Sequence, residues 1–255
     1  MNRFTDRTVV VTGGGGGIGT AVCTSFAEEG AKVAVLDRDE SAAASTAQAI
    51  TDAGGTAIAI GCDITERSSV DAGIDHVNSE LGSIDALVNN AGWDLFVPFV
   101  DTQPEDWSRL IDINLIGALH MHHAVIPRMI DNGGGRIVNV SSDAARVGSS
   151  GEAVYAACKA GMVALSKTLA REHSRHNITF NVVCPGPTDT ELLATVTDAA
   201  ANPEKLREAF RRSIPIGRLG QPEDLSGAIL FFASDAASFV TGQVLSVSGG
   251  LTMAG

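Results

Sequence analysis

A tyrosine and a lysine lie four residues apart in the segment YAACK, at Tyr155 and Lys159. Within a helix, this spacing places both side chains on one face and one turn apart. A tyrosine ordinarily loses its proton near pH 10, so it serves as a base near neutral pH only when positive charge lies close to it. Because the ammonium of Lys159 can supply that charge, the pair predicts a tuned acid/base catalyst. The same pair also occurs by chance on exposed helices, so it needs support from other residues.

Two polar residues elsewhere in the chain provide that support. Ser142 ends the strand-like segment GRIVNVSS, and Asn114 lies in the otherwise apolar segment IDINLIGA. An amide buried among apolar side chains needs hydrogen-bond partners, and a short chain of ordered water toward Lys159 would satisfy Asn114. We therefore predict a catalytic set of Asn114, Ser142, Tyr155 and Lys159.

Five consecutive glycines follow a strand-like run near the start of the chain, in TVVVTGGGGGIG. A strand, a tight glycine turn and a helix start form the arrangement in which backbone amides face a pyrophosphate. Gly14, Gly16 and Gly19 fit the spacing G-x-G-x-x-G. Gly13, Gly17 and Gly19 fit the wider spacing T-G-x-x-x-G-x-G equally well, and the glycine run alone does not decide between the two registers.

An acidic residue follows at the distance that a dinucleotide site requires. Asp37 ends the next strand-like run, VAVLD, eighteen residues after Gly19. A carboxylate at this place accepts hydrogen bonds from the adenosine ribose and repels a 2′-phosphate. The sequence therefore predicts NAD as the cofactor rather than NADP, although Arg38, directly after Asp37, carries the charge to accept a phosphate.

These residues are expected to meet at one edge of a sheet. Short β-branched runs alternate with longer amphipathic stretches along the whole chain, and continuous apolar runs are typical of parallel strands buried on both faces. We predict an α/β fold, a Rossmann-type doubly wound parallel sheet of about seven strands with helices on both faces. Ligands of such a sheet bind beyond the carboxyl ends of its strands. The expected helices cover residues 19–29, 40–53, 66–81, 104–131, 152–176 and 222–234.

Length and charge limit the classes of partner. The 255 residues contain no linker or repeat, so we expect a single domain over residues 1–255. The formal net charge of −12 argues against nucleic acid, and no segment is apolar enough for a signal peptide or a membrane span. Four widely spaced cysteines favour reduced thiols in the cytoplasm. His120, His122 and His123 lack a carboxylate at ligand spacing, and we predict no metal site.

The motifs together resemble a known family. The pattern T-G-x-x-x-G-I-G at residues 12–19, N-N-A-G at residues 89–92, the catalytic set above and the P-G pair at residues 185–186 are similar to the classical short-chain dehydrogenase/reductase family over essentially the whole chain. The resemblance implies that the fingerprint glycines are Gly13, Gly17 and Gly19, and that the three glycines at residues 14–16 occupy variable positions. It also implies a homotetramer and a substrate lid at about residues 190–215.

The resemblance further implies roles for individual residues. Ser142 is expected to hydrogen-bond the substrate oxygen, and Tyr155 to remove the hydroxyl proton while a hydride passes to NAD. Asn114 and Lys159 are expected to relay the proton outward. Further contacts with the cofactor are implied for Ile18, Asp63, Ile64, Asn90, Pro185, Gly186, Thr188 and Thr190, as well as for Tyr155 and Lys159.

The loops around the expected pocket bear on the substrate. WDLFVPF, which follows the N-N-A-G motif, and DAARVGSSGEAV, which follows Ser142, are similar to members of the family that oxidise alicyclic hydroxyacyl-CoA thioesters. Trp93 is expected near the pocket mouth as an apolar wall. Arg146 is expected to pair with Asp94 or Asp143, or else to bind a substrate carbonyl, and we favour the pair.

A basic cluster lies in the expected lid, at Lys205, Arg207, Arg211, Arg212 and Arg218. It has the charge to hold the phosphates of coenzyme A. A solvated helical face balanced by Glu204 and Glu208 is the simpler interpretation, and we favour it.

Three functions remain open on the sequence. The first is an NAD-dependent dehydrogenase acting on a secondary hydroxyl β to a CoA thioester. The second is a 3-oxoacyl-thioester reductase that uses NADPH, against which Asp37 argues. The third is a regulator that binds a dinucleotide without catalysis, which the complete catalytic set disfavours.

Overall fold

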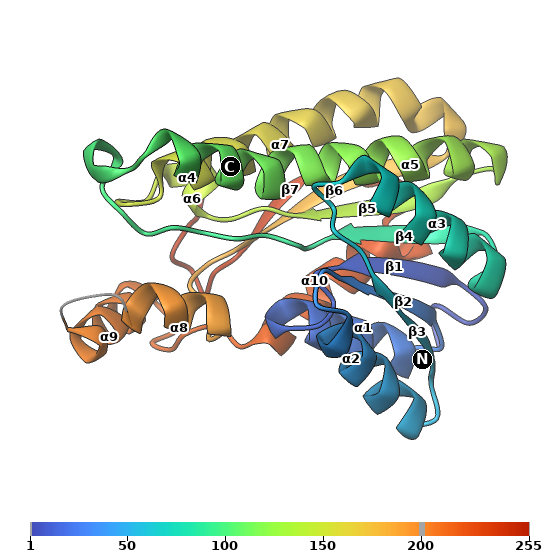
Figure 1. Cartoon of the computed structure of the whole chain (residues 1–255), viewed down its shortest axis with the longest axis horizontal. Helices are drawn as coiled ribbons and strands as arrows, with labels where there is room; N and C mark the ends of the chain where they lie inside the picture. Colours follow the sequence, from blue (N-terminus) through green and yellow to red (C-terminus); the bar gives the residue numbers. More distant parts are fainter. Residues whose placement is uncertain (1, 199–201, 255) are drawn as a thin grey trace.

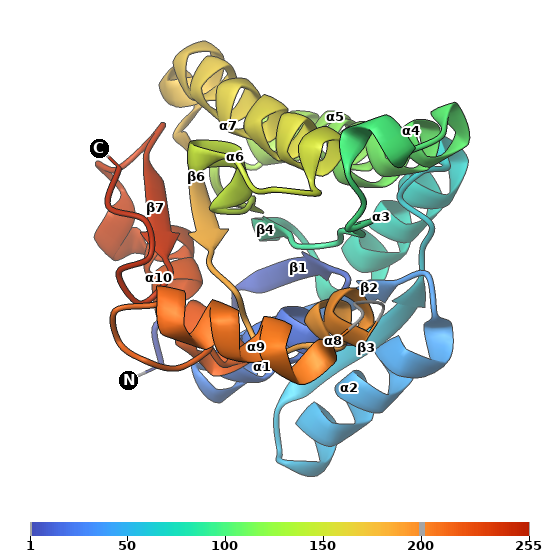
Figure 2. The ribbon, with the colours of Figure 1, turned by 90° about the vertical axis from the view of Figure 1, so that its left-hand side faces the viewer.

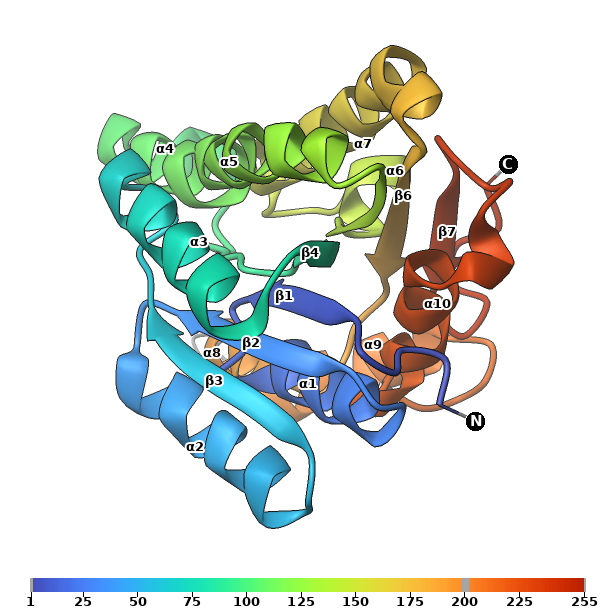
Figure 3. The same cartoon turned by 90° about the vertical axis from the view of Figure 1, so that its right-hand side faces the viewer.

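A single parallel sheet organises the chain, as predicted. The computed structural model describes residues 2–198 and 202–254. Seven strands pair in the order β3-β2-β1-β4-β5-β6-β7, every neighbour parallel. The strands labelled in Figure 3 follow this order across the sheet. The strands are β1 (Thr8–Thr12), β2 (Lys32–Asp37), β3 (Thr56–Gly61), β4 (Ile84–Asn89), β5 (Gly135–Val140), β6 (Ile178–Pro185) and β7 (Val244–Val247).

Helices cover both faces of the sheet (Figure 1). One face carries α1 (Gly17–Glu28), α2 (Glu40–Asp52) and α10 (Pro222–Ala233), and the other carries α3 (Arg67–Leu81), α5 (Gly117–Asp131) and α7 (Ala153–His173). The remaining helical segments are α4 (Pro104–Ile111), α6 (Ala144–Val147), α8 (Glu191–Asp198), α9 (Pro203–Ser213), a π-helical turn (Asp112–Ile116) and short 3₁₀ turns at Phe99–Asp101, Ser174–His176 and Asp235–Ala237. No helix within residues 2–198 and 202–254 is long and apolar enough to cross a membrane.

The same four residues, Gln-Pro-Glu-Asp, start both α4 and α10. In each case the glutamine side chain accepts from the backbone of the third helical residue, and the aspartate there accepts from the glutamine backbone. Proline at the first helical position has its φ already set for a helix and no amide left without a partner. This local chemistry explains why the predicted starts of these two helices, at residues 104 and 222, are confirmed.

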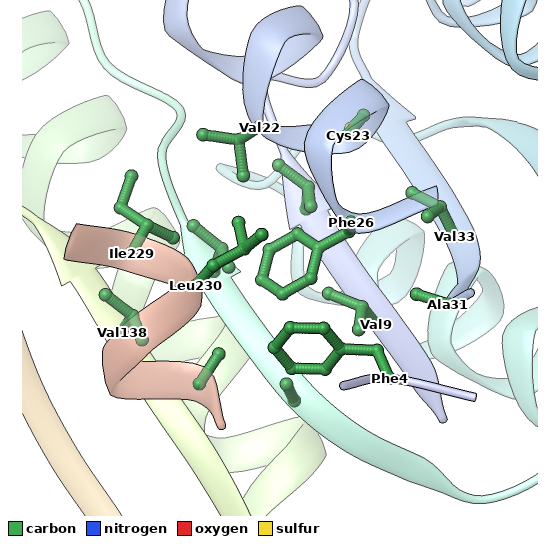
Figure 4. Packing of buried hydrophobic residues seen from close by; sticks show 14 of the residues in the cluster. Phe4, Val9, Val22, Cys23, Phe26, Ala31, Val33, Val138, Ile229 and Leu230 are labelled. Atoms are coloured by element: carbon green, nitrogen blue, oxygen red, sulfur yellow. The ribbon is translucent and has the colours of Figure 1, made fainter. Parts of the chain in front are cut away.

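Two apolar layers hold the helices on the sheet. In one layer Phe4 packs edge-on against Phe26 of α1, with ring centroids 4.8 Å apart, and Leu230 of α10 lies beside them (Figure 4). The layer on the other face contains Met121, Met129 and Phe180, all fully buried. Burial of side chains of this size contributes about 1.5–3 kcal/mol each, so the sheet is firmly sandwiched and its carboxyl edge is left free for a site.

One predicted helix differs from the observed one: the helix expected over residues 104–131 is interrupted by the π-helical turn Asp112–Ile116, which contains Asn114. The segment expected as a lid, at about residues 190–215, contains α8 and α9, which lie across the carboxyl ends of the strands (Figure 2). Residues 199–201 of that segment lie outside the described residues.

The glycine run forms the turn between β1 and α1, and most of its members have little room for a side chain. Gly13 and Gly17 adopt positive φ angles of 63° and 51°. A Cβ on Gly19 would lie 1.9 Å from the Gly13 carbonyl oxygen. A Cβ on Gly14 or Gly15 would also lie 2.7 Å from a neighbouring side chain, so these two are not freely variable, contrary to our expectation.

Substitution within the run should therefore separate the glycines by their effect on stability. We expect Gly19→Ala to lower the free energy of unfolding by about 3 kcal/mol or more, because helix α1 must move away from the turn. Gly16 has no atom within 4 Å of its Cβ position, so Gly16→Ala should cost less than about 1 kcal/mol. Urea denaturation of both variants measures the difference, and equal losses would contradict the steric argument.

Candidate active site

A cavity of about 670 Å³ lies at the carboxyl edge of the sheet, between the glycine turn, the ends of β4, β5 and β6 and the helices α8 and α9. Gly19 and Asn114 are buried behind its wall. Most of the predicted site residues line this one cavity: Gly13, Gly17, Ile18, Asp37, Asp63, Ile64, Asn90, Trp93, Ser142, Tyr155, Lys159, Pro185, Gly186, Thr188 and Thr190.

One half of the cavity has the features of a dinucleotide site. The carboxylate of Asp37 accepts the backbone N–H of Gly15 at 3.0 Å, which fixes the acid beside the glycine turn. Gly16, at the N-cap of α1, faces open space. A tight turn, a free helix start and an acid at the end of β2 are the donors and acceptors that a pyrophosphate and a ribose require. The residues present therefore fit a nicotinamide dinucleotide.

Asn90 connects the glycine turn, in this half of the cavity, to the end of β4. Its amide donates to the carbonyl oxygens of Thr12 and Gly13, both at 3.1 Å, and the Thr12 hydroxyl accepts the backbone amides of Asn90 and Ala91, also at 3.1 Å. The glycine turn and the end of β4 are thus joined by four hydrogen bonds. The backbone N–H and the amide nitrogen of Asn90 both donate to the protein, so a cofactor would not meet free donors on this residue.

The remaining predicted cofactor residues lie on two other loops. Asp63 accepts the backbone and hydroxyl of Thr65, and Ile64 packs against Gly117 of α5. Past β6, Thr190 lies at the start of α8, and a Cβ on Gly17 would lie 3.4 Å from its methyl group. Helix α8 therefore begins directly beside the glycine turn.

Tyr155 and Lys159 lie on one face of α7, as predicted, and both are buried. The Lys159 Nζ atom lies 5.6 Å from the centroid of the Tyr155 ring and donates to the carbonyl oxygen of Val140 at 3.1 Å. Ser142 follows β5, and its side chain lies close enough to Tyr155 to act on the pKa of the phenol. The hydroxyl, the phenol and the ammonium therefore converge at one point of the cavity wall.

Asn114 is held by the π-helical turn. Its amide donates to the carbonyl oxygens of Trp93 at 2.7 Å and Leu110 at 3.0 Å, and its Oδ1 accepts the Trp93 N–H at 3.3 Å. A Cβ on Gly92 would lie 3.0 Å from that Oδ1 and 3.1 Å from Lys159 Nζ. The Asn114 amide oxygen and the Lys159 ammonium thus both lie beside Gly92, and the bridging water between them stays a prediction.

The electrostatics around Tyr155 are governed by burial. Burial, and then the charges of Asp94 and Glu152, raise the pKa of Tyr155, while the hydrogen bond from Ser142 acts in the opposite direction. Burial also lowers the pKa of Lys159 to about 8. The Lys159 ammonium points to Val140, so desolvation of Tyr155 is the larger effect in the protein by itself. Stabilisation of the phenolate by Lys159 together with an oxidised nicotinamide ring stays a prediction.

Two acids that the sequence analysis did not select face this centre. Asp94 follows β4, Glu152 precedes α7, and the two carboxyl groups are hydrogen-bonded to each other. Burial, together with Glu152, raises the pKa of Asp94 to about 8. The pair therefore holds a proton near neutral pH. Glu152 stands three residues before Tyr155, so its helical spacing was the available signal, whereas nothing in the sequence joins it to Asp94.

Trp93 lines the cavity, and the guanidinium of Arg109 in α4 lies over its ring at 3.9 Å from the ring centroid. Arg109 was not a predicted site residue. Arg146 was predicted to pair with Asp94 or Asp143, and this is wrong. It donates to Ser246 at 2.8 Å and to the carbonyl of Ala254, because α6 turns its side chain toward the C-terminal segment.

Most residues of the basic cluster at residues 205–218 form ion pairs with acids of the protein. Arg211 and Arg212 both bind Glu208 at 2.7 Å. Arg207 and Arg218 pair with acids outside the cluster, Asp189 at 2.6 Å and Asp224 at 2.5 Å respectively. This arrangement agrees with the favoured interpretation of a balanced helical face.

The three histidines of α5 each have a partner in the protein. His120 contacts the Ile64 carbonyl at 2.9 Å and His123 contacts Arg67 at 2.9 Å. His122 is buried beside Asn139 and donates to the Ala118 carbonyl at 2.6 Å, and burial lowers its pKa to about 4. The four cysteines are free and buried.

Comparison with known proteins now defines the family. A family model described as enoyl-(acyl carrier protein) reductase matches residues 13–252. The chain is 39% identical to an acetoacetyl-CoA reductase of Rhizobium meliloti, over 96% of this chain and 98% of that one. It is 40% identical to a cis-4-hydroxycyclohexanecarboxylate dehydrogenase of Sinomonas cyclohexanicum, over 98% of each.

A solved structure extends the comparison to the fold. The crystal structure of a 3-ketoacyl-(acyl-carrier-protein) reductase from Brucella melitensis, complexed with NADH, superimposes with a TM-score of 0.91 at 35% identity, covering 98% of this chain and 99% of that one. The protein is an oxidoreductase that acts on hydroxyl and keto groups. The chain belongs to the short-chain dehydrogenase/reductase family, whose cofactor is a nicotinamide dinucleotide.

The protonated acid pair should make stability depend on pH. The pKa of Asp94 is raised in the folded protein, so its contribution is complete below pH 4 and is lost as the pH rises toward 8. Asp94→Asn cannot ionise. Relative to wild type, this variant should gain about 1–3 kcal/mol in the free energy of unfolding between pH 5 and pH 8.

Urea denaturation at pH 5 and pH 8 measures this change. Asp131→Asn, at the exposed end of α5, removes one carboxylate far from the cavity and should show no such trend. A constant difference between Asp94→Asn and wild type at both pH values would mean that Asp94 is ionised throughout.

Proposed function

We propose that this protein oxidises a secondary hydroxyl β to a CoA thioester with NAD. The most specific form of the proposal is the conversion of 2-hydroxycyclohexanecarboxyl-CoA to 2-ketocyclohexanecarboxyl-CoA during degradation of alicyclic and aromatic acids. The observation that carries it is the convergence of Tyr155, Lys159 and Ser142 at the cavity wall, beside the glycine turn. The choice of substrate rests on the pocket loops, whose sequences resemble those of 2-hydroxycyclohexanecarboxyl-CoA dehydrogenase.

The cavity around the catalytic residues supports an apolar ring as substrate. Beyond Tyr155, its wall is built from apolar side chains of four separate segments: Trp93, Phe96, Val147, Leu192, Val196 and Phe210. A cyclohexane ring gains binding energy in proportion to the apolar area that leaves water. Since α8 and α9 supply three of these residues, the lid would cover the ring.

Residues of the chain can accept the proton of the substrate hydroxyl and release it to water. Ser142 donates a hydrogen bond to the substrate oxygen, and the Tyr155 oxygen takes the hydroxyl proton as the carbon loses its hydride. A bound oxidised nicotinamide supplies the hydride acceptor and the positive charge that lowers the pKa of the phenol. Lys159 and Asn114 border the space through which the proton leaves by way of water. Orientation in the cavity and the preset donors provide most of the acceleration.

Asp37 supports NAD as the partner in this reaction. Its carboxylate is fixed by Gly15 and by the backbone of Asp39 at 3.0 Å, at the end of β2. A ribose with free hydroxyls can donate to it, whereas a 2′-phosphate would be repelled. The neighbouring Arg38 also lines the cavity and is the one feature that favours a phosphate.

Reduction of a 3-oxoacyl thioester with NADPH is the second candidate. Two of the similar proteins are reductases of such substrates by name, the acetoacetyl-CoA reductase and the acyl-carrier-protein reductase. The same residues serve either direction of the reaction. A regulator that binds a dinucleotide without turnover is disfavoured because every predicted catalytic position holds a competent side chain.

One assay panel tests the proposal. Purified enzyme should reduce NAD when given 2-hydroxycyclohexanecarboxyl-CoA, with kcat/KM at least about tenfold higher than with NADP, a difference of about 1.4 kcal/mol. Good turnover of unrelated alcohols with none of the thioester would remove the substrate claim. A preference for NADPH and 3-oxoacyl thioesters would support the second candidate. As the matched control, Tyr155→Phe should still bind NAD but lose at least about 10²-fold in kcat.

We also propose a homo-oligomer, with a tetramer expected from the family resemblance. Phe239 and Met253 leave 102% and 83% of their surfaces exposed, and Met253 belongs to the C-terminal segment expected at a subunit contact. Exposed apolar side chains of this size are typical of protein interfaces. Light scattering on the purified protein should give about four times the chain mass, and Met253→Asp should weaken the assembly. A monomer at assay concentration would contradict the proposal.

A further inference from the structure

The stacked pair of Trp93 and Arg109 forms part of the cavity wall near the catalytic residues. Trp93 follows the Asn-Asn-Ala-Gly motif at the end of β4, and Arg109 belongs to α4. The guanidinium carbon lies 3.9 Å from the Trp93 ring centroid, which is the face-on contact that a planar cation prefers. This contact holds the guanidinium in place but leaves its N–H groups at the edge, free to donate.

Those donors have no partner among residues 2–198 and 202–254, since neither a hydrogen bond nor an ion pair joins the Arg109 side chain to another residue there. This is unusual beside two acids of the same wall. Asp94 accepts the backbone N–H of Leu95 at 2.7 Å and shares a hydrogen bond with Glu152. The carboxyl groups are therefore bound to each other while the nearby guanidinium is not used.

The positions of the basic residues in the cavity define the role of Arg109 further. Within the described chain, three basic residues line it: Arg38, Arg109 and Lys159. Arg38 lies beside Asp37 at the dinucleotide half, and Lys159 is buried and directed to Val140. Arg109 is thus the one cation in this part of the described chain that is open to the substrate.

The position of the pair is set by the catalytic centre itself. The backbone N–H and carbonyl of Trp93 both bond to the Asn114 amide, and the preceding Gly92 borders Lys159. The Trp93 residue therefore contacts Asn114 through its backbone and the Arg109 guanidinium through its ring. An oxygen bound there would belong to a group attached close to the carbinol carbon, not to the distant phosphates of coenzyme A.

We propose that Arg109 is a specificity-determining residue that binds the acyl oxygen of the substrate and so selects hydroxy acids and their thioesters over plain alcohols. The inference rests on the proposed oxidation of a ring hydroxyl. A guanidinium offers two parallel N–H groups to a carboxylate or one to a thioester carbonyl. The shared chemistry is an acyl oxygen, and its two sources, the thioester and the free acid, are separate arms of the test.

The test compares three substrates: 2-hydroxycyclohexanecarboxyl-CoA, free 2-hydroxycyclohexanecarboxylate, and cyclohexanol, which has no acyl group. Arg109→Gln should lower kcat/KM about 10- to 100-fold for whichever acyl substrate the enzyme uses. It should change kcat/KM for cyclohexanol by less than about twofold. Arg109→Lys, which keeps the charge but not the planar fork, should recover part of the loss with the free acid. Lys167→Gln, on the exposed side of α7, removes one positive charge elsewhere and should leave all three values unchanged.

A binding measurement makes the result independent of turnover. Calorimetric titration of the enzyme–NADH complex with cyclohexanecarboxylate and with cyclohexanecarboxyl-CoA should show weaker binding to Arg109→Gln than to wild type, at an unchanged melting temperature. Equal binding of both compounds, or an equal loss of kcat/KM with cyclohexanol, would overturn the inference. If the free acid is oxidised in an Arg109-dependent way and the thioester is not, the inference stands while the proposed CoA substrate fails.

Discussion

The hydrogen bonds between Thr12, Asn90 and the glycine turn are the connection on which the site depends. Because β1 and β4 are parallel neighbours, their carboxyl ends lie side by side. The Asn90 amide and the Thr12 hydroxyl lock those ends together across the point where the strand order reverses. The dinucleotide turn and the loop of Gly92 and Trp93 therefore have one fixed spacing. Two further residues of the site are placed from that loop, since Trp93 holds Asn114 and supports Arg109.

Several buried amides around this connection are hydrogen-bonded within the protein. Asn114 reaches Trp93 and Leu110 because the π-helical turn brings its side chain to the cavity wall. A π-turn weakens the helix locally, and such turns are typical of functional sites. Behind it, Asn139 donates to Ser166 at 2.8 Å, which keeps the buried ends of β5 and α7 in register. The rigidity of the catalytic residues therefore comes from the buried amides as much as from the apolar core.

The sequence predicted those features of the structure that depend on residues close together in the chain. The parallel sheet of seven strands, the helix starts at Pro104 and Pro222, the shared face of Tyr155 and Lys159, and the position of Asp37 follow from periodicity, capping and spacing. The π-helical turn, the tight packing of Gly14 and Gly15, and the partners of Arg146 do not, because each depends on contacts between segments far apart in the chain. The same reason hid Asp94, Glu152 and Arg109, which have no motif and meet only in the folded protein.

The charges of the cavity fit together once these residues are included. A chain with a net charge of −12 would ordinarily repel an anionic substrate. Here the acid pair of Asp94 and Glu152 retains a proton, because its two carboxyl groups cannot both ionise cheaply in a buried wall. That proton halves the negative charge opposite Tyr155. Within the described residues Arg109 forms no ion pair with a carboxylate either, so the same cavity offers both a reduced negative charge and a cation to an acyl oxygen of the substrate.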